Sequence, residues 1–336
     1  MSQSKPVAVI ILNWNGEKML REYLPSVVEH TPAAIADIIV ADNGSTDGSV
    51  EMLRREFPSV RLIAFDRNHG FAQGYNEAIA LIYKEYKYSV LLNSDVRVAD
   101  DWLTPLYEFM TARPTVGAVQ PKLLSLKSPD HFEYAGAAGG FLDCNGYPYC
   151  RGRIFATSEA DHGQYDTPMQ VDWASGACLM VDNDLYTACG GLDSKFFAHM
   201  EEIDLCWRIR IAGREVWAVP SAQVYHLGGG SLPPSDSKKV YLNFRNSLLM
   251  LHKNLPDGVR KRKLFWRRIL DAVAWARFVV LGEWRNAGTI LKAHRDFRRM
   301  RGDYTSHPAV NLLNSRVDIL TAYFLKGRRT YSSLHR

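Results

Sequence analysis

The sequence lacks the features that mark disulfide-rich, zinc-binding and membrane-spanning proteins. Its five cysteines are an odd number and include no Cys-x-x-Cys pair, which argues against a disulfide framework and a zinc knuckle. Residues 1–6 are polar, with no charged segment before an apolar signal-type core, so secretion is not expected. Arginines interrupt the C-terminal apolar runs well short of the ~20 residues that a membrane span needs. These absences favour the reducing cytoplasm.

Charge divides the chain into two unequal parts. With 336 residues, 46% of them hydrophobic, the chain can bury a full core in one large domain or two. Residues 1–255 hold 23 Lys and Arg against 30 Asp and Glu, whereas residues 256–336 hold 18 against 6. The boundary falls at Pro256-Asp257-Gly258, a turn-type sequence. The sequence therefore predicts an acidic body, 1–255, and a basic C-terminal region, 256–336.

Apolar strand-like segments alternate with helix-like segments along the acidic body. Strands are expected at 7–12, 38–41, 60–65 and 89–92, and helices at Glu17–His30, from Asp47 onward, and at 71–86. Continuous apolar strands separated by helices indicate an α/β fold with a parallel sheet covered on both faces. Ligands of such sheets bind beyond the carboxyl ends of the strands.

Polar residues follow all four expected strands. They are Asn13-Trp14-Asn15-Gly16, the stretch from Asp42 to Ser49, the stretch from Asp66 to Gly70, and Asn93-Ser94-Asp95. Any one of these segments fits an ordinary turn or helix cap. Together they predict the rim of one polar pocket.

Three carboxylates crowd into four positions at Glu201, Glu202 and Asp204, beside Phe197 and Trp207. Like charges next to apolar groups raise at least one pKa unless a cation compensates, so this segment is interpreted as a reaction centre. Arg208, four residues after Asp204, is placed to pair with it on one helix face. A solvated acidic helix start is the alternative interpretation.

The order of the motifs resembles glycosyltransferase family 2, and among its members the bacterial rhamnosyltransferase-type enzymes. The motifs are V-x-V-I-I-L-N-W-N-G, V-A-D-N-G-S-T-D-G-S, N-x-G-F-A-x-G-Y-N, L-L-N-S-D, W-x-S-G-A, F-F-x-x-x-E-E-x-D-L-C-W-R and H-x-x-G-G-S, across about residues 7–250. The resemblance implies a GT-A fold, with a Rossmann-like, mostly parallel central sheet flanked by helices and a C-terminal helical extension. Its nucleotide-binding half would be about 7–122 and its acceptor and catalytic half about 123–255.

The resemblance also implies a donor site and a divalent cation. Asp42 matches the acid that binds the nucleotide base, and a carboxylate suits the N3–H of uracil or thymine. Asp95 and His226 match the metal ligands for Mn²⁺ or Mg²⁺, the imidazole favouring Mn²⁺, and the glycines after His226 would approach the phosphates. A strand-ending turn and a structural histidine are the alternatives. The expected donor residues are Asn13, Asn15, Asp42, Asn43, Asn68, Gly70, Asn76, Asn93 and Ser94.

Glu202 aligns with the catalytic base of the family, where Asp is usual, so the neighbouring Glu201 and Asp204 are candidates to share its role. Arg208 would support them. Trp173, Gly176 and Ala177 match a stretch beside the donor sugar and acceptor, although a core position for the tryptophan is an open alternative. The segment 125–170 shows no clean periodicity and is expected to form variable loops over the acceptor side.

The basic region contains amphipathic helical spacing with Trp, Phe and Arg. This composition is typical of helices that lie on an anionic membrane surface, so 256–302 is expected to make a peripheral membrane contact. A helical bundle packed on the body is the alternative. No nucleic-acid-binding module is recognisable, and nucleic acid is not an expected partner.

These expectations combine into one function. The chain is expected to be a metal-dependent, inverting glycosyltransferase that moves a sugar from a dTDP- or UDP-sugar, dTDP-rhamnose in particular, to a glycan or polyprenyl-linked acceptor. The setting would be bacterial cell-surface polysaccharide assembly at the cytoplasmic face of the membrane. Two alternatives stay open. A sugar nucleotidyltransferase should carry a glycine-rich loop with Arg and Lys after the first strand, and an inactive nucleotide-sugar-binding protein would keep Asp42 and Asp95 without a base.

Overall fold

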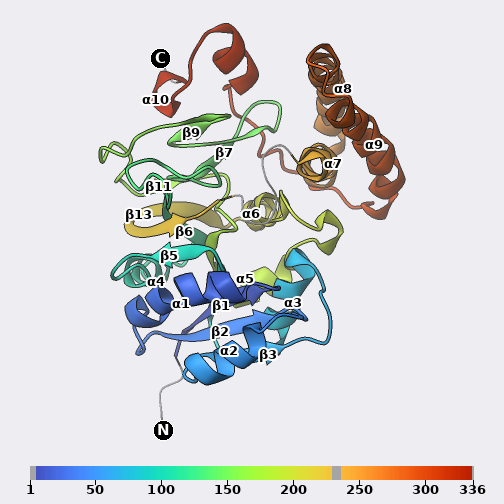
Figure 1. Cartoon of the computed structure of the whole chain (residues 1–336). Helices are drawn as coiled ribbons and strands as arrows, with labels where there is room; N and C mark the ends of the chain where they lie inside the picture. Colours follow the sequence, from blue (N-terminus) through green and yellow to red (C-terminus); the bar gives the residue numbers. More distant parts are fainter. Residues whose placement is uncertain (1–4, 229–235, 335–336) are drawn as a thin grey trace.

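The computed structural model describes residues 5–228 and 236–334 (Figure 1). The strands of the main sheet are β1 (Val7–Asn13), β2 (Ala36–Asp42), β3 (Arg61–Ala64), β4 (Tyr88–Asn93), β5 (Val96–Val98), β6 (Val116–Ser125), β11 (Met169–Gln170), β12 (Cys178–Asp182) and β13 (Glu215–His226). The helices of the same body are α1 (Glu17–His30), α2 (Ser49–Glu56), α3 (Phe71–Ile82), α4 (Thr104–Thr111), α5 (Asn183–Ala188) and α6 (Glu201–Ile211).

The main sheet has nine strands, and its two halves differ. Its order is β11-β13-β6-β12-β4-β1-β2-β3, with β5 paired to β13. In the N-terminal half, β1 runs parallel to both β2 and β4, and β2 runs parallel to β3. In the second half, β12 is antiparallel to β4 and β6, whereas β13 is parallel to β6. The α/β fold is confirmed, and the parallel segment is the half assigned to nucleotide binding.

Both faces of the sheet are buried, because successive strand residues pack into two separate cores. In β1, Val7, Val9 and Ile11 belong to one core, whereas Ala8 and Ile10 belong to the other. The first core also contains buried residues of α1, α2 and α4, and the second contains buried residues of α3, α5 and α6. Apolar residues at every strand position are therefore required by the layered architecture.

The segment expected to be irregular, 125–170, forms a second sheet. Its antiparallel strands are β7 (Gly140–Leu142), β8 (Pro148–Cys150), β9 (Arg153–Ile154) and β10 (Thr157–Ser158). The prediction of loops misses these strands, because strands of two or three residues are too short to show a period in the sequence. This small sheet lies beside the main sheet on the side of β11 and β13 (Figure 1).

The C-terminal region begins one helix earlier than predicted and is only partly helical. The helices α7 (Ser237–Asn254), α8 (Asp257–Val280) and α9 (Trp284–Met300) pack together, so residue 256 separates two helices of one bundle. From residue 304 the chain is largely extended and returns to the small sheet, where the Ile319 N–H donates to Asp143 at 3.2 Å. It ends in the π-helical turn Thr321–Leu325 and α10 (Tyr331–Leu334). Among the described residues, no helix has the length and apolarity to cross a bilayer.

Candidate active site

The ends of β1 and β2 carry two of the polar segments that the sequence assigns to the rim of a pocket. Their register places Asn13 beside Asp42, and the Asn13 amide donates to the Asp42 carboxylate at 2.9 Å. The other Asp42 oxygen accepts the Ser45 N–H at 2.9 Å, and the Asn15 side chain accepts the Thr46 N–H at 2.7 Å. Asp42 is 2% exposed. In this structure Asp42 therefore fixes the loop after β2, and its contact with a nucleobase remains a prediction.

The side chains of Asn43 and Asn68 form hydrogen bonds within the neighbouring loop. The Asn43 amide donates to the side chain of Asn68 and to the carbonyl of Gly70, and its oxygen accepts the His69 N–H. Asn76 is bound elsewhere: its amide donates to Leu192, and its oxygen accepts the Leu192 N–H at 2.9 Å. Asn76 thus ties α3 to the loop after α5. These hydrogen bonds give Asn76 a structural role, and its contact with the donor stays a prediction.

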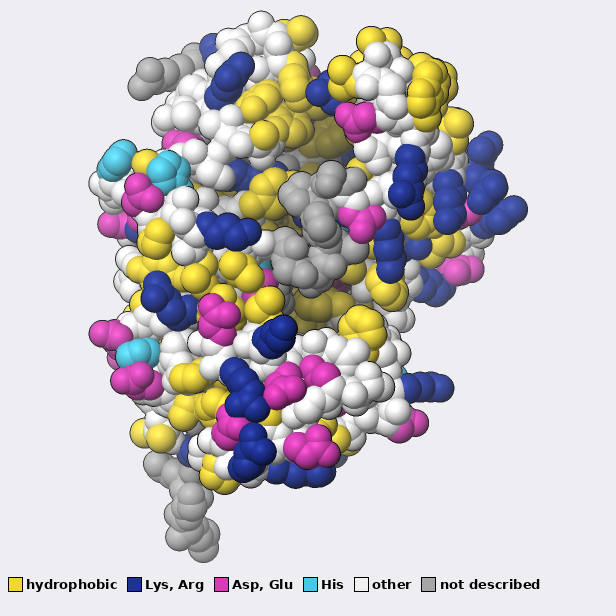
Figure 2. Space-filling view, in the orientation of Figure 1, with side chains coloured by type: hydrophobic (Ala, Val, Ile, Leu, Met, Phe, Trp, Pro, Cys, Tyr) yellow, Lys and Arg dark blue, Asp and Glu magenta, His cyan; other side chains and the backbone are white. Residues whose placement is uncertain are grey.

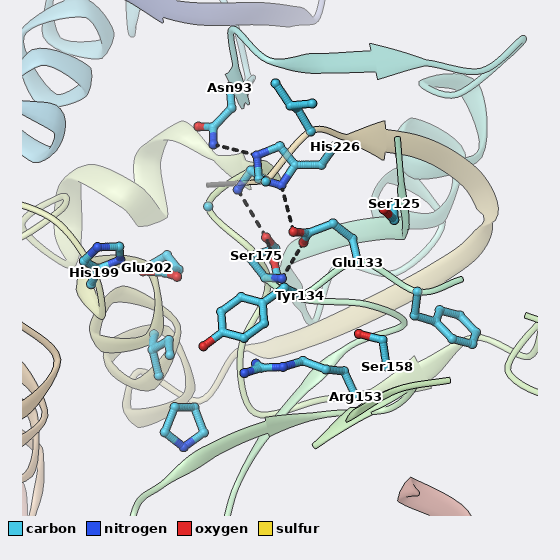
Figure 3. Close-up of a pocket in the computed structure, with 18 of the residues that line it drawn as sticks. Asn93, Ser125, Glu133, Tyr134, Arg153, Ser158, Ser175, His199, Glu202 and His226 are labelled. Atoms are coloured by element: carbon cyan, nitrogen blue, oxygen red, sulfur yellow. Dashed lines mark hydrogen bonds and ion pairs between the residues drawn. The ribbon is translucent and has the colours of Figure 1, made fainter. Parts of the chain in front are cut away.

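A cavity of about 910 Å³ opens at the carboxyl ends of the central strands. Its wall contains Asn93 and Asp95 after β4, His226 at the end of β13, and Glu202 at the start of α6 (Figure 3). Residues from the small sheet and α7 complete it. The cavity therefore brings the metal-type motif and the carboxylate cluster, more than 100 residues apart in sequence, into one site.

Two carboxylates hold the imidazole of His226. Its Nε2 lies 3.1 Å from Asp95 and its Nδ1 lies 3.4 Å from Glu133, while β5 pairs with β13 so that Val96 faces His226. Burial opposes a charge on this ring, but the hydrogen bonds to Asp95 and Glu133 outweigh burial and raise the pKa of His226 to about 10. A cation is therefore favoured between these groups, whether it is a proton or a metal ion.

Glu133 is not predicted from the sequence, although it is 4% exposed and contacts His226, the expected metal ligand. It lies in the segment without periodicity, and nothing local distinguishes it from other acids there. Gly228 lies directly beside it, because a Cβ at Gly228 would meet the Glu133 carboxylate at 2.7 Å, and its φ is +66°. Gly228 thus permits the close approach of backbone to Glu133. Gly229, Gly230 and Ser231 of the same motif lie outside the described residues.

The carboxylates of Glu201 and Glu202 lie in the first turn of α6 and each has one buried oxygen without a hydrogen-bond partner in the described structure. Burial, partly offset by backbone N–H groups, raises the pKa of Glu202 to about 7. Burial and the charge of Glu202 raise the pKa of Glu201 well above its usual value. The backbone of Gly176 faces Glu202, since a Cβ there would lie 3.5 Å from it. Glu202 is therefore the carboxylate poised to exchange a proton near neutral pH.

The turn before α6 is strained and is held by α7. Phe197, His199 and Met200 have φ values of +68°, +69° and +75°, which side chains other than glycine rarely adopt. The amide of Asn246 on α7 donates to the carbonyls of Phe196, Ala198 and His199. Asn246 thus positions the carboxylates through the backbone. No local pattern in the sequence indicates this contact, because it spans nearly 50 residues.

Asp204 does not line the cavity. It is fully buried and accepts from Arg208 at 2.9 Å, from Lys253 at 2.9 Å and from Asn254 at 2.7 Å. Burial opposes its charge, but Arg208, Lys253 and Asn254 lower the pKa of Asp204 below its usual value. The predicted pairing with Arg208 is confirmed. The predicted catalytic role of Asp204 is wrong, because its carboxylate joins α6 to α7 instead.

Comparison with known proteins agrees with this geometry. The family model described as "Glycosyl transferase family 2" matches residues 8–165. The N-acetylglucosaminyl-diphospho-decaprenol L-rhamnosyltransferase of Mycobacterium tuberculosis is 27% identical over 234 residues, covering 65% of this chain and 75% of that protein. The chain is a glycosyltransferase, and its residues 8–165 match family 2.

Solved structures agree with the GT-A architecture of this glycosyltransferase. The mannosyltransferase PcManGT from Pyrobaculum calidifontis, solved with GDP-Man and Mn²⁺, superposes with a TM-score of 0.54 at 15% identity, covering 90% of this chain and 84% of that one. GalNAc-T7, solved with UDP, GalNAc and Mn²⁺, gives a TM-score of 0.53 at 18% identity, and this chain spans 48% of its length. At such identities the likeness concerns the fold.

Two further predicted residues of the glycosyltransferase, Trp173 and Ala177, line the cavity and also make structural contacts. Trp173 is 4% exposed and its indole N–H donates to the Phe141 carbonyl at 3.0 Å, so the core alternative holds for most of the ring. The Ala177 carbonyl accepts the Asn93 N–H at 3.0 Å and thereby joins β12 to the end of β4. Ser94 is not among the residues that line the cavity.

Replacing Asp204 by Asn should destabilise the glycosyltransferase by about 3 kcal/mol, because Arg208 and Lys253 would remain buried without their carboxylate. Since the folded pKa of Asp204 is depressed, its contribution is present above the unfolded value near 3.9 and is lost as pH falls. Urea unfolding at pH 7 measures the difference. The matched control Asp303→Asn removes an exposed ion pair with Lys195 and should cost under about 1 kcal/mol. Equal effects of the two changes would contradict the structural role of Asp204.

Proposed function

We propose that this glycosyltransferase moves a sugar, with inversion, from a nucleotide-sugar donor to a hydroxyl of a glycan or lipid-linked acceptor. The observation that carries the proposal is the single cavity in which Glu202, with a pKa of about 7, shares walls with Asn93, Asp95 and His226. Glu202 would take the proton of the acceptor hydroxyl while the hydroxyl oxygen attacks the anomeric carbon of the donor sugar. The bond between that carbon and the nucleoside diphosphate breaks, and the diphosphate leaves. One displacement of this kind inverts the anomeric centre.

The residues at Asp95 fit a divalent cation. Asp95 and the Nε2 of His226 are adjacent donors of the types that Mn²⁺ accepts, and Glu133 holds the other ring nitrogen, as a second carboxylate commonly does for a metal-bound histidine. The described residues contain no cluster of three or more such ligands, so the diphosphate and water would complete the coordination. When bound, the cation would neutralise charge that develops on the leaving diphosphate.

A rhamnose donor is the finer part of the proposal, and the Mycobacterium tuberculosis relative supports it. Its name gives L-rhamnosyl transfer to N-acetylglucosaminyl-diphospho-decaprenol. We infer a related reaction here, with dTDP-rhamnose as donor, a lipid-linked sugar as acceptor and cell-surface glycan assembly as the setting. The carboxylate of Asp42 would suit the N3–H of thymine.

A thermal-shift panel of nucleotide sugars, each with and without Mn²⁺, tests the proposal. A donor that binds the folded chain raises its stability by mass action, about 2.7 kcal/mol at a hundredfold excess over Kd. We expect the largest shift for dTDP-rhamnose with Mn²⁺, followed by rhamnosyl transfer to an N-acetylglucosaminyl-diphospho-lipid. A flat response to every nucleotide sugar would refute the proposed function.

The membrane contact expected for 256–302 is proposed here for α8 in particular. Although α8 packs on α7 and α9, it leaves a row of large apolar side chains exposed by between 37% and 85%: Phe265, Trp266, Ile269, Val273, Trp275 and Val280. Hydrophobic side chains gather at the α8 end of the molecule, and Lys and Arg line the adjacent edge (Figure 2). Exposed apolar side chains beside Lys and Arg are the chemistry that an anionic lipid surface accepts.

Substituting Trp266 and Val273 together by Ser should lower binding to phosphatidylglycerol vesicles by about thirtyfold, because each change removes on the order of 1 kcal/mol of apolar burial in the lipid. Co-sedimentation of the full chain measures it. The matched control is Leu81→Ser on α3, an equally exposed leucine of the catalytic body. Unchanged vesicle binding combined with loss of a dimer in analytical ultracentrifugation would show that α8 contacts a second copy instead.

A further inference from the structure

The cavity contains cations that the proposed chemistry does not use. Arg153 on β9 and Lys239 on α7 both line it, and both approach the ring of Tyr134. The guanidinium carbon of Arg153 lies 3.5 Å from the ring centroid, and the Nζ of Lys239 lies 5.2 Å from it. Tyr134 is itself 48% exposed. Two positive charges therefore converge on one aromatic ring at the wall of the site.

Neither cation has a carboxylate partner among residues 5–228 and 236–334, and the remaining residues of the sequence include no Asp or Glu. The Nε of Arg153 donates to the Phe155 carbonyl at 2.8 Å, and the guanidinium also lies near the buried Cys150 thiol. Several cations near the core contact carboxylates instead, among them Lys122, Arg208 and Lys253. Unpaired cations in a concave site attract an anionic ligand.

The place of Arg153 separates it from the expected donor groups. Asn93 and His226 lie at one side of the cavity and Arg153 at the other, with Glu133 and Tyr134 between them (Figure 3). The side with Asp95 and Glu133 is acidic and would receive a diphosphate together with a divalent cation. The side with Arg153 and Lys239 has the charge to bind a phosphate without a metal. The cavity can therefore hold two anionic groups at once, the donor diphosphate on the acidic side and a second phosphate on the basic side.

We propose that Arg153 and Lys239 bind a phosphate or diphosphate of the acceptor, next to the sugar whose hydroxyl faces Glu202. The inference rests on the proposed function and specifies its acceptor as a sugar linked through phosphate. The planar guanidinium of Arg153 offers two parallel N–H donors to phosphate oxygens, and Lys239 adds a point charge. Tyr134 keeps both cations in place through its ring face.

The test measures binding of geranyl diphosphate to the full chain saturated with dTDP and Mn²⁺, by calorimetry, so that the donor side is already filled. Arg153→Gln should raise Kd at least about tenfold and Lys239→Gln about fivefold, because each removes a charge-assisted contact. The matched control Lys238→Gln changes the neighbouring exposed lysine of α7, which does not line the cavity, and should leave Kd within about twofold. The affinity for dTDP should be the same in all four proteins.

Three results would overturn the proposal. Unchanged Kd for geranyl diphosphate in both variants would show that Arg153 and Lys239 do not bind the acceptor phosphate. A loss of dTDP affinity as large as the loss of geranyl diphosphate affinity would show that they bind the donor instead. Loss of phosphatidylglycerol vesicle binding with intact geranyl diphosphate binding would assign them to lipid headgroups. Binding is measured without turnover, so failure of sugar transfer would refute the proposed function separately.

Discussion

The substitution Glu202→Gln should lower kcat by about 10²–10⁴-fold, the contribution usual for a positioned general base. Gln keeps the shape of Glu202 but takes up no proton from the acceptor hydroxyl. Donor affinity should stay within about twofold, because the Glu202 carboxylate lies at the start of α6, whereas the ends of β1 and β2 form the expected nucleotide site. Steady-state kinetics with dTDP-rhamnose, alongside dTDP binding by calorimetry, measure both quantities.

The pH profile supplies a second readout of the same residue. Since burial raises the pKa of Glu202 to about 7, kcat/KM of the unaltered enzyme should fall as pH drops through 7, where the carboxylate gains a proton. That limb should vanish in Glu202→Gln and persist in Glu202→Asp, which keeps a carboxylate one methylene shorter. Glu201→Gln is the matched neighbour. Burial and the charge of Glu202 raise the pKa of Glu201 well above its usual value, which makes Glu201 hold its proton more readily, so its loss should matter much less. Full activity of Glu202→Gln would show that the base is another group.

Removal of the divalent cation should abolish transfer, with a fall in kcat of at least about 10³-fold, since neutralising the leaving diphosphate is worth several kcal/mol. Asp95→Ala should reproduce the effect of chelation and should not be rescued by added Mn²⁺, because it leaves His226 and Glu133 without the second donor. Mn²⁺ binding in the presence of dTDP, measured by calorimetry, tests the site independently of turnover.

Glu133→Gln separates the two carboxylates that hold His226. It should weaken Mn²⁺ binding by about 10–100-fold, as loss of a carboxylate behind a metal-bound histidine usually does. Asp100→Asn, a change at an exposed carboxylate of the same body, is the control and should leave Mn²⁺ binding unaltered. Transfer that is indifferent both to chelation and to Asp95→Ala would contradict a metal-dependent reaction.

Local pattern predicted the nucleotide half of the fold well. The helix Glu17–His30 has the predicted bounds, and the strand expected at 7–12 is Val7–Asn13. The helix expected at 71–86 ends at Ile82, because the chain turns before β4. The small sheet was missed, since four strands of two or three residues depend on contacts with one another rather than on their own period.

The site residues also divide into those that a local pattern predicts and those that long-range contacts determine. Asp95, His226 and Glu202 carry motifs, and the structure brings all three into one cavity. Asp204 belongs to the same motif as Glu202, yet its side chain points to Arg208 and Lys253 instead. On a helix, residues two apart face different directions, so one acidic cluster serves two purposes. A count of carboxylates in the sequence does not reveal that division.

The sequence by itself determined the layered α/β body, the family resemblance and the cluster of candidate carboxylates, because these depend on local periodicity and on residues close together in the chain. Only the tertiary structure decided which carboxylate is poised near neutral pH, that Glu133 holds His226, and that Arg153 and Lys239 converge on Tyr134. Burial and charge partners set these properties. Both arise from contacts between strands and helices distant in sequence, which no local pattern records.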